Sequence, residues 1–173
     1  MKTVGLVTLG QSPRPDMVEL LRLSNTISTH VAGALDGIDL SGLKELLWHE
    51  QSEALPLVTR YNGESVVVAN HALVPFLQKA VSALEEHVSG ISILCTESFP
   101  QIRSSKPYIR VDRLMDEAIR KVCTRATGGN IAVFVPTPGQ IVPAEARWSL
   151  AGYARACCLP PSAPEEVIQT VCR

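Results

Sequence analysis

Three short loops of this chain carry the side chains best suited to chemistry. The first loop, residues 10–14, holds Gly10, Gln11, Ser12 and Arg14 directly after an apolar run. A glycine lets a ligand approach the backbone, a serine and the free amides of a following helix donate hydrogen bonds, and a guanidinium grips carboxylate or phosphate. The pattern predicts an anion site. It is equally typical of an ordinary strand-to-helix turn, with proline and aspartate stabilising the helix start.

The middle loop, residues 95–99, begins with a cysteine that leaves an apolar run. Beside free helix amides the Cys95 thiol can have a lowered pKa and act as base or nucleophile, and Thr96 and Ser98 can donate hydrogen bonds to a bound carboxylate. Free cysteines also fill apolar strands, so both interpretations of Cys95 stay open. Glu97 is a possible general acid or base, although a solvated carboxylate is the commoner role. The polar run at residues 110–113 is typical of a solvated loop.

The late loop, residues 136–140, starts with Pro136 and Thr137 and has a capping-box pattern, with threonine followed three residues later by glutamine. Each of the three loops follows a run that resembles a strand. In a parallel sheet such loops lie at one edge, where ligands of α/β proteins bind. The sequence therefore predicts that the three loops converge on one crevice.

The elements that must position these loops alternate between strand-like and helix-like patterns. Strands are predicted at residues 3–9, 29–34, 91–95, 131–135 and 153–158, and helices at 16–23, 41–48, 70–88, 112–123, 137–150 and from 162 onward. Residues 56–60 and 65–69, joined through Asn62 and Gly63, predict a β-hairpin. The expected fold is α/β, with a parallel sheet covered by helices on both faces, right-handed crossovers and a small hairpin insertion.

Burial expectations follow from the same patterns. Residues 91–95, apart from Ser92, and residues 131–135 are apolar, which predicts strands buried on both faces. The helix at 16–23 is expected to cover the first strand. Asn70 is the expected N-cap of the helix at 70–88. The helix at 112–123 is expected to turn four apolar side chains inward: Leu114, Met115, Ile119 and Val122.

Composition limits the classes of function. The 173 residues are 46% hydrophobic and 19% charged, which suits one compact domain. Sixteen basic against 17 acidic residues, with no basic run, argue against nucleic acid or an anionic membrane as partner. Neither a signal peptide nor a membrane span is recognised, so a cytoplasmic location is expected. Five irregularly spaced cysteines predict free thiols, and the four histidines lack the spacing of zinc sites, so neither metal nor cofactor is expected.

Five segments together resemble one protein family. They read Val-Thr-Leu-Gly-Gln-Ser-Pro-Arg-Pro-Asp at 7–16, Gly-Ala-Leu-Asp-Gly at 33–37, Pro-Leu-Val-Thr-Arg at 56–60, Leu-Cys-Thr at 94–96 and Val-Pro-Thr-Pro-Gly-Gln at 135–140. In this order, over about the first 150 residues, the chain resembles the AroM family. That family is similar to the aspartate/glutamate/hydantoin racemase superfamily. The resemblance implies two flavodoxin-like α/β lobes around a ligand cleft, and an association with aromatic amino-acid metabolism.

The same resemblance implies a mechanism and a departure from it. Racemases of this kind use two cysteines on opposite faces of a small carboxylate, without a cofactor, and Cys95 corresponds to the first. The second follows a late strand, and no matching motif occurs before Arg173. Residues 1–173 are therefore expected to be one domain with an incomplete second lobe, which exposes a sheet edge and can favour homo-oligomers. Cys158 is a candidate replacement for the second thiol.

Two functions remain open from the sequence. The chain can be a racemase-like enzyme in which Cys95 transfers a proton to a small carboxylic acid. It can instead be a module, or an inactive fragment, that binds a small carboxylate or another anionic metabolite without chemistry. The expected ligand contacts are the same in both cases: Gly10, Gln11, Ser12, Arg14, Thr96, Ser98, Pro136 and Thr137.

Overall fold

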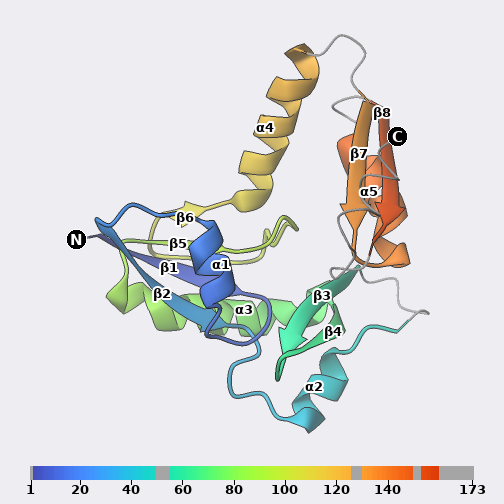
Figure 1. Ribbon diagram of the computed structural model, residues 1–173. Coiled ribbons are helices and arrows are strands. Elements are labelled where there is room, and N and C mark those ends of the chain that lie inside the picture. Colours follow the sequence, from blue (N-terminus) through green and yellow to red (C-terminus); the bar gives the residue numbers. More distant parts are fainter. Residues whose placement is uncertain (1, 50–54, 126–129, 150–152, 160–173) are drawn as a thin grey trace.

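The computed structural model describes residues 2–49, 55–125, 130–149 and 153–159 (Figure 1). Its largest sheet has four parallel strands in the order β2-β1-β5-β6. The strands are β1 (Lys2–Thr8), β2 (Ile27–Gly33), β5 (Gly90–Ile93) and β6 (Tyr108–Ile109). The α/β class and the parallel sheet are thus confirmed. The two-residue β6 was not predicted, because so short a strand has no apolar periodicity of its own.

The predicted hairpin is confirmed as β3 (Pro56–Tyr61) and β4 (Glu64–Ala69), which pair antiparallel. Asn62 and Gly63 turn the chain with φ angles of 49° and 82°. Positive φ at two successive residues is what a tight hairpin turn needs, and asparagine and glycine adopt it most readily. The turn therefore sets the pairing register of the hairpin from local sequence alone.

The main hydrophobic core lies between this sheet and α3 (Asn70–Leu84), which a 3-10 turn at Glu85–His87 extends. The helical spacing predicted its buried side chains correctly, for Leu73, Leu77, Val81 and Leu84 are all buried. The expected N-cap lies one residue off. Ala69 is the N-cap, and Asn70 Oδ1 accepts a hydrogen bond from the amide of His71 at 2.7 Å.

Two further helices, α1 (Pro15–Leu20) and α2 (Leu40–Leu46), lie between β1 and β3 in the chain. Helices flank the sheet, with α1 and α3 beside it in Figure 1. The prediction that the first helix covers β1 with an apolar face is wrong, because no residue of α1 is buried and Leu20 is 81% exposed. A helix of six residues makes fewer than two turns, so it cannot present an apolar stripe to the sheet.

The later part of the chain forms a separate two-stranded parallel sheet of β7 (Asn130–Val135) and β8 (Tyr153–Cys158). A 3-10 turn at Pro138–Gln140 leads into α5 (Ile141–Trp148), which packs on both strands. The strands lie where they were predicted, but the expected burial of β7 on both faces is wrong. Phe134 is 38% exposed, because α5 covers one face of this small sheet only.

The two sheets are connected by α4 (Val111–Arg125), which projects from the first sheet in Figure 1. The helix is where it was predicted, but the inward orientation of its apolar side chains is wrong. Leu114, Met115 and Val122 are 55%, 37% and 67% exposed, and Ile119 is half-buried. Among the described residues, neither sheet packs along α4, so its apolar stripe stays exposed. Helical periodicity shows that a stripe exists but not whether another element covers it. The predicted helix from residue 162 lies outside the described residues.

Candidate functional site

The middle loop begins where β5 ends, next to β1. The amide of Leu94 donates to the Val7 carbonyl oxygen at 2.8 Å, and the amide of Cys95 turns back to the Ile93 carbonyl oxygen at 2.9 Å. The Glu97 amide then donates to the Cys95 sulfur at 3.3 Å. The loop is therefore a tight turn at the carboxyl end of a central strand, the position at which α/β folds bind ligands.

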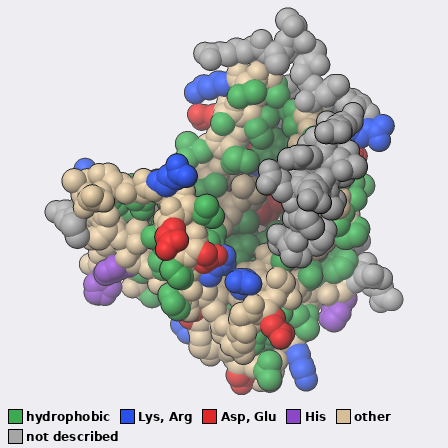
Figure 2. Space-filling model, viewed as in Figure 1, with side chains coloured by type: hydrophobic (Ala, Val, Ile, Leu, Met, Phe, Trp, Pro, Cys, Tyr) green, Lys and Arg blue, Asp and Glu red, His purple; other side chains and the backbone are tan. Residues whose placement is uncertain are grey.

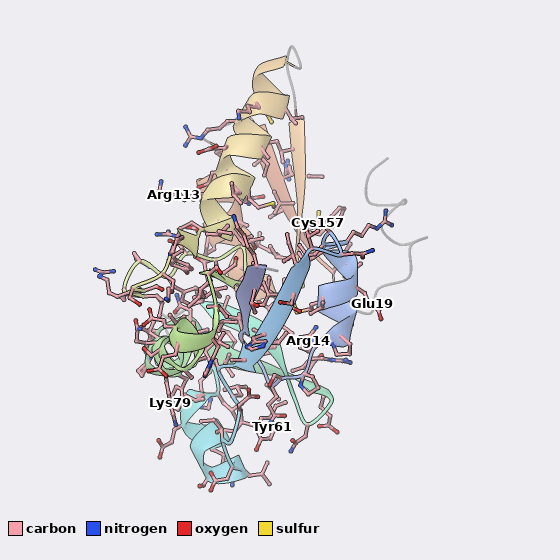
Figure 3. The ribbon with its side chains drawn as sticks, turned by 90° about the vertical axis from the view of Figure 1, so that its left-hand side faces the viewer. Arg14, Glu19, Tyr61, Lys79, Arg113 and Cys157 are labelled. Atoms are coloured by element: carbon pink, nitrogen blue, oxygen red, sulfur yellow. The ribbon has the colours of Figure 1, made fainter. Side chains whose placement is uncertain are left out.

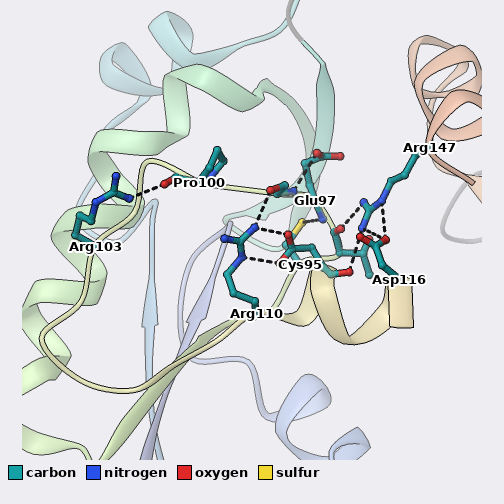
Figure 4. Close-up of polar contacts among 10 residues, drawn as sticks. Cys95, Glu97, Pro100, Arg103, Arg110, Asp116 and Arg147 are labelled. Carbon is teal, nitrogen blue, oxygen red and sulfur yellow. Dashed lines mark hydrogen bonds and ion pairs between the residues drawn. The ribbon is translucent and has the colours of Figure 1, made fainter. Parts of the chain in front are cut away.

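Arg110, directly after β6, reaches the middle loop from one side (Figure 4). Its Nε donates to Oδ1 of Asp112 at 2.8 Å, and its Nη2 donates both to Oδ2 of Asp112 and to the hydroxyl of Ser98, the latter at 2.9 Å. Asp112 is only 5% exposed, and the hydrogen bond from Arg110 holds its pKa below the ordinary value. Within the described residues Nη1 of Arg110 has no hydrogen-bond partner, so a fixed guanidinium keeps donors for a ligand.

Arg147, near the end of α5, approaches the same loop from the other side. Its Nη1 donates to the Thr96 carbonyl oxygen at 2.6 Å. Its Nε and Nη2 both donate to Oδ1 of Asp116, at 3.2 and 3.0 Å, and Nη2 also reaches the Asp112 carbonyl oxygen at 3.3 Å. The guanidinium carbon lies 4.5 Å from the centre of the Trp148 ring. Arg147 therefore ties the later unit of the chain to the middle loop and to α4.

The Cys95 thiol lies inside this cluster. Burial raises its pKa to about 11, and the hydrogen bond from the Glu97 amide opposes that rise only in part. The charge of Arg147 also favours the thiolate, but the nearby carboxylates of Glu97 and Asp112 oppose it. In the structure the pKa of the Cys95 thiol is thus raised, whereas the sequence pattern allowed a lowered pKa. At neutral pH the Cys95 side chain is a thiol and a poor base.

The first loop is held by the protein itself. Both the amide and the hydroxyl of Ser12 donate to the carboxylate of Asp36, each at 2.7 Å. The Gln11 amide donates to the Arg60 carbonyl oxygen at 3.1 Å, and its side-chain oxygen accepts from the Asn62 amide at 2.7 Å. These groups therefore fasten the end of β1 to the end of β2 and to the hairpin.

Gly10 is needed for the same packing. A Cβ atom at this position would lie 2.4 Å from the Arg60 carbonyl oxygen and 2.7 Å from the Thr59 hydroxyl. The space beside the Gly10 backbone, which the sequence analysis assigned to a ligand, is thus filled by the hairpin.

The Arg14 side chain, labelled in Figure 3, donates from Nε and Nη2 to the carboxylate of Asp16 and forms an ion pair with it. This pairing lowers the pKa of Asp16 to about 2.

The late loop lies beside the hairpin. A Cβ atom on Gly139 would lie 2.8 Å from Cγ of Pro56 and 3.5 Å from the Trp48 ring. The Thr137 hydroxyl is 3.2 Å from the side-chain oxygen of Gln140, and no capping bond from Thr137 reaches the backbone. Half-buried Pro136 and Thr137 thus open a 3-10 turn where the capping-box pattern predicted a helix start.

The structure brings together some of the predicted residues and separates others. Cys95, Thr96 and Ser98 form one polar cluster with Arg110, Asp112, Asp116 and Arg147. The contacts of the first loop run to Asp36 and the hairpin, and those of the late loop run to Pro56 and Trp48. The four partners in the cluster were missed as site residues. Arg110 and Asp112 stand in the polar run taken for a solvated loop, and Arg147 lies 51 residues from Thr96, without a local signal.

Other features limit the chemistry at this site. The described cysteines Cys95, Cys123, Cys157 and Cys158 are free thiols, as predicted, and Cys172 lies outside the described residues. Across the described ranges, no group of three or more His, Cys, Asp or Glu side chains is placed to hold a metal ion. A search of the same ranges finds no helix with the length and apolar character needed to cross a membrane.

Comparison with known proteins gives one match. The sequence model of a family described as AroM protein matches residues 4–171, which is nearly the whole chain. No curated protein matches the chain, and no solved structure does.

Proposed function

This chain belongs to the AroM protein family, and we propose from the geometry of its own residues that it binds a small carboxylate metabolite at the middle loop. The observation that carries this proposal is the approach of two guanidinium groups, those of Arg110 and Arg147, to the two sides of residues 96–98. Each is oriented by an aspartate, Asp112 or Asp116. Oriented guanidinium groups bind planar carboxylates with little loss of side-chain freedom.

The donors available to a ligand follow from the bonds already made. Nη1 of Arg110 keeps its N–H groups, and the exposed side chain of Thr96 adds a hydroxyl at the mouth of the loop. The bonds to Asp112 and Ser98 fix the plane of the Arg110 guanidinium before a ligand arrives. A ligand carboxylate would therefore meet donors that are already in position, which favours affinity.

The charge of the cluster narrows the ligand class. Two guanidinium groups stand against three carboxyl groups, those of Glu97, Asp112 and Asp116. A dianionic phosphate would be repelled by this surplus of acid, whereas a carboxylate that also carries an ammonium group would be attracted at both ends. The proposed ligand is thus a small carboxylic acid with a single carboxylate at the arginines, with amino acids the favoured class.

The racemase-like alternative needs Cys95 as a base. Its raised pKa argues against that role, because at neutral pH almost none of the thiol is ionised. A return proton from Cys158 would also be needed, and the contacts of the described residues do not bring that side chain to Cys95. We therefore place binding without proton transfer ahead of catalysis. The contacts of the first loop run to Asp16, Asp36 and the hairpin, and that of Thr137 runs to Gln140, rather than to the middle loop. The proposed contacts are therefore Arg110, Arg147, Thr96 and Ser98.

The test is a binding measurement on two arginine variants. Small carboxylates and amino acids are titrated calorimetrically into the wild type, and the best ligand is then titrated into Arg110→Lys and Arg147→Ala. Loss of a charged hydrogen bond costs about 1.5–3 kcal/mol, so affinity is expected to fall by roughly tenfold or more in each variant.

Arg103→Ala is the matched control, because Arg103 is exposed, lies in the same region and donates to the carbonyl oxygens of Pro100 and Ile102. It removes the same charge and should leave affinity unchanged. Equal affinity of all three variants and the wild type would show that the ligand does not bind at the middle loop.

A further inference from the structure

The exposed apolar stripe of α4 is a feature that the proposed ligand site does not explain. Hydrophobic side chains gather over this helix in the space-filling view (Figure 2). The stripe repeats at three- and four-residue intervals and consists of Val111, Leu114, Met115, Ala118 and Val122. Leu114 and Val122 are 55% and 67% exposed. An amphipathic helix of this length with its apolar face open to water is a surface that association would bury.

We propose that α4 pairs with α4 of a second copy of this chain, the two helices running antiparallel. Part of the stripe is symmetric about Ala118, with Leu114 four residues before it and Val122 four residues after it. A two-fold axis beside Ala118 then places Leu114 of one copy at the level of Val122 of the other. The small alanine side chain lets the two backbones approach closely at the crossing, and a two-fold interface uses one patch twice.

The charges of α4 favour the antiparallel direction. Glu117 comes just before the centre of the stripe, and Arg120 and Lys121 come just after it. In an antiparallel pair, Glu117 of one copy lies near Arg120 and Lys121 of the other copy. In a parallel pair, side chains of like charge would lie at the same level. Opposed helix dipoles add to the same preference. Asp112 and Asp116 bond to Arg110 and Arg147, so pairing leaves the ligand site intact.

One test is the oligomeric state. Sedimentation of the wild type is expected to show a concentration-dependent dimer, and Val122→Glu is expected to weaken it at least tenfold, since burying an unpaired charge is strongly unfavourable. Val142→Glu is the matched control, because Val142 on α5 is 74% exposed and lies outside the stripe. It should dimerise like the wild type. A dimer insensitive to Val122→Glu would overturn the proposal.

A second test reports the direction of the helices. Ala118→Cys should form a disulfide between copies under mild oxidation, since the antiparallel axis brings this position next to itself. Arg113→Cys should not, because Arg113 points outward from α4 (Figure 3). Wild type, with native Cys123 on α4, gives the background.

A protein that stays monomeric at every concentration would contradict the proposal. The labelling rate of the thiol introduced by Ala118→Cys would then show whether the stripe is covered or open. Slow labelling of the thiol introduced by Ala118→Cys would mean that the chain's own residues 160–173 cover the stripe. Fast labelling of that thiol would mean that nothing covers it.

Discussion

Gly33→Ala is expected to lower the free energy of unfolding by about 3 kcal/mol, the upper end of the usual cost of overpacking. A Cβ atom at Gly33 would lie 2.4 Å from the Gly10 carbonyl oxygen and 2.7 Å from both the Ser12 amide nitrogen and Oδ1 of Asp36. Two of these atoms belong to the backbone, so relief requires the ends of β1 and β2 to separate. That movement would also break the bonds from Ser12 to Asp36.

Urea unfolding measures this loss, with Gly42→Ala as control. A Cβ atom at Gly42 would lie 3.2 Å from Cγ2 of Ile38 and 3.4 Å from Oδ1 of Asp39, both in side chains that can adjust. Gly42 also lies in α2, where alanine is favoured over glycine by about 1 kcal/mol. The control is expected to be neutral or more stable. A Gly33→Ala protein as stable as the wild type would show that the first loop does not pack as described.

The thiol of Cys95 is expected to react with iodoacetamide at pH 7.5 about 100-fold more slowly than the same thiol in the unfolded chain. Its pKa is raised from 9.0 to about 11, and each unit lowers the thiolate fraction roughly tenfold at neutral pH. Only the thiolate reacts, so the rate should rise with pH beyond pH 9 and level off only near pH 11. Peptide mass spectrometry at a series of pH values follows Cys95 separately from the other cysteines.

The unfolded protein in urea is the control for this measurement, since it shows the reactivity of the same peptide without burial. Burial hinders the approach of iodoacetamide and also lowers the thiolate fraction. The midpoint of the pH profile separates the two effects, because it depends on the pKa of the thiol alone. A midpoint below pH 8 in the native protein would restore Cys95 as a candidate base and favour the racemase-like alternative over binding alone.

Local patterns predicted the elements that local forces specify. The hairpin was found because asparagine and glycine at residues 62 and 63 favour the positive φ angles of its turn. The buried face of α3 was found because its packing repeats with the helical period. The capping box at Thr137 did not form, although the residue types were right, because the chain enters α5 through a 3-10 turn.

Burial and convergence were predicted less well, because they depend on distant segments. Periodicity showed that α4 has an apolar stripe but not that both sheets leave it open, and the same holds for Phe134 on β7. The three loops all follow strands, yet the chain divides those strands between two sheets, so the loops have different neighbours. Arg147 reaches Thr96 from another unit of the chain, and no spacing in the sequence reports such a contact.

The location of the carboxylate site is tested most directly by NMR titration of the ¹⁵N-labelled protein with alanine, acetate and succinate. We expect saturable shifts, strongest with alanine, in the amides of residues 96–98 and in the Nε signals of Arg110 and Arg147, while Gln11 and Ser12 stay unchanged. Shifts confined to the first loop, or shifts that grow in proportion to ligand without saturation, would contradict a carboxylate site at the middle loop.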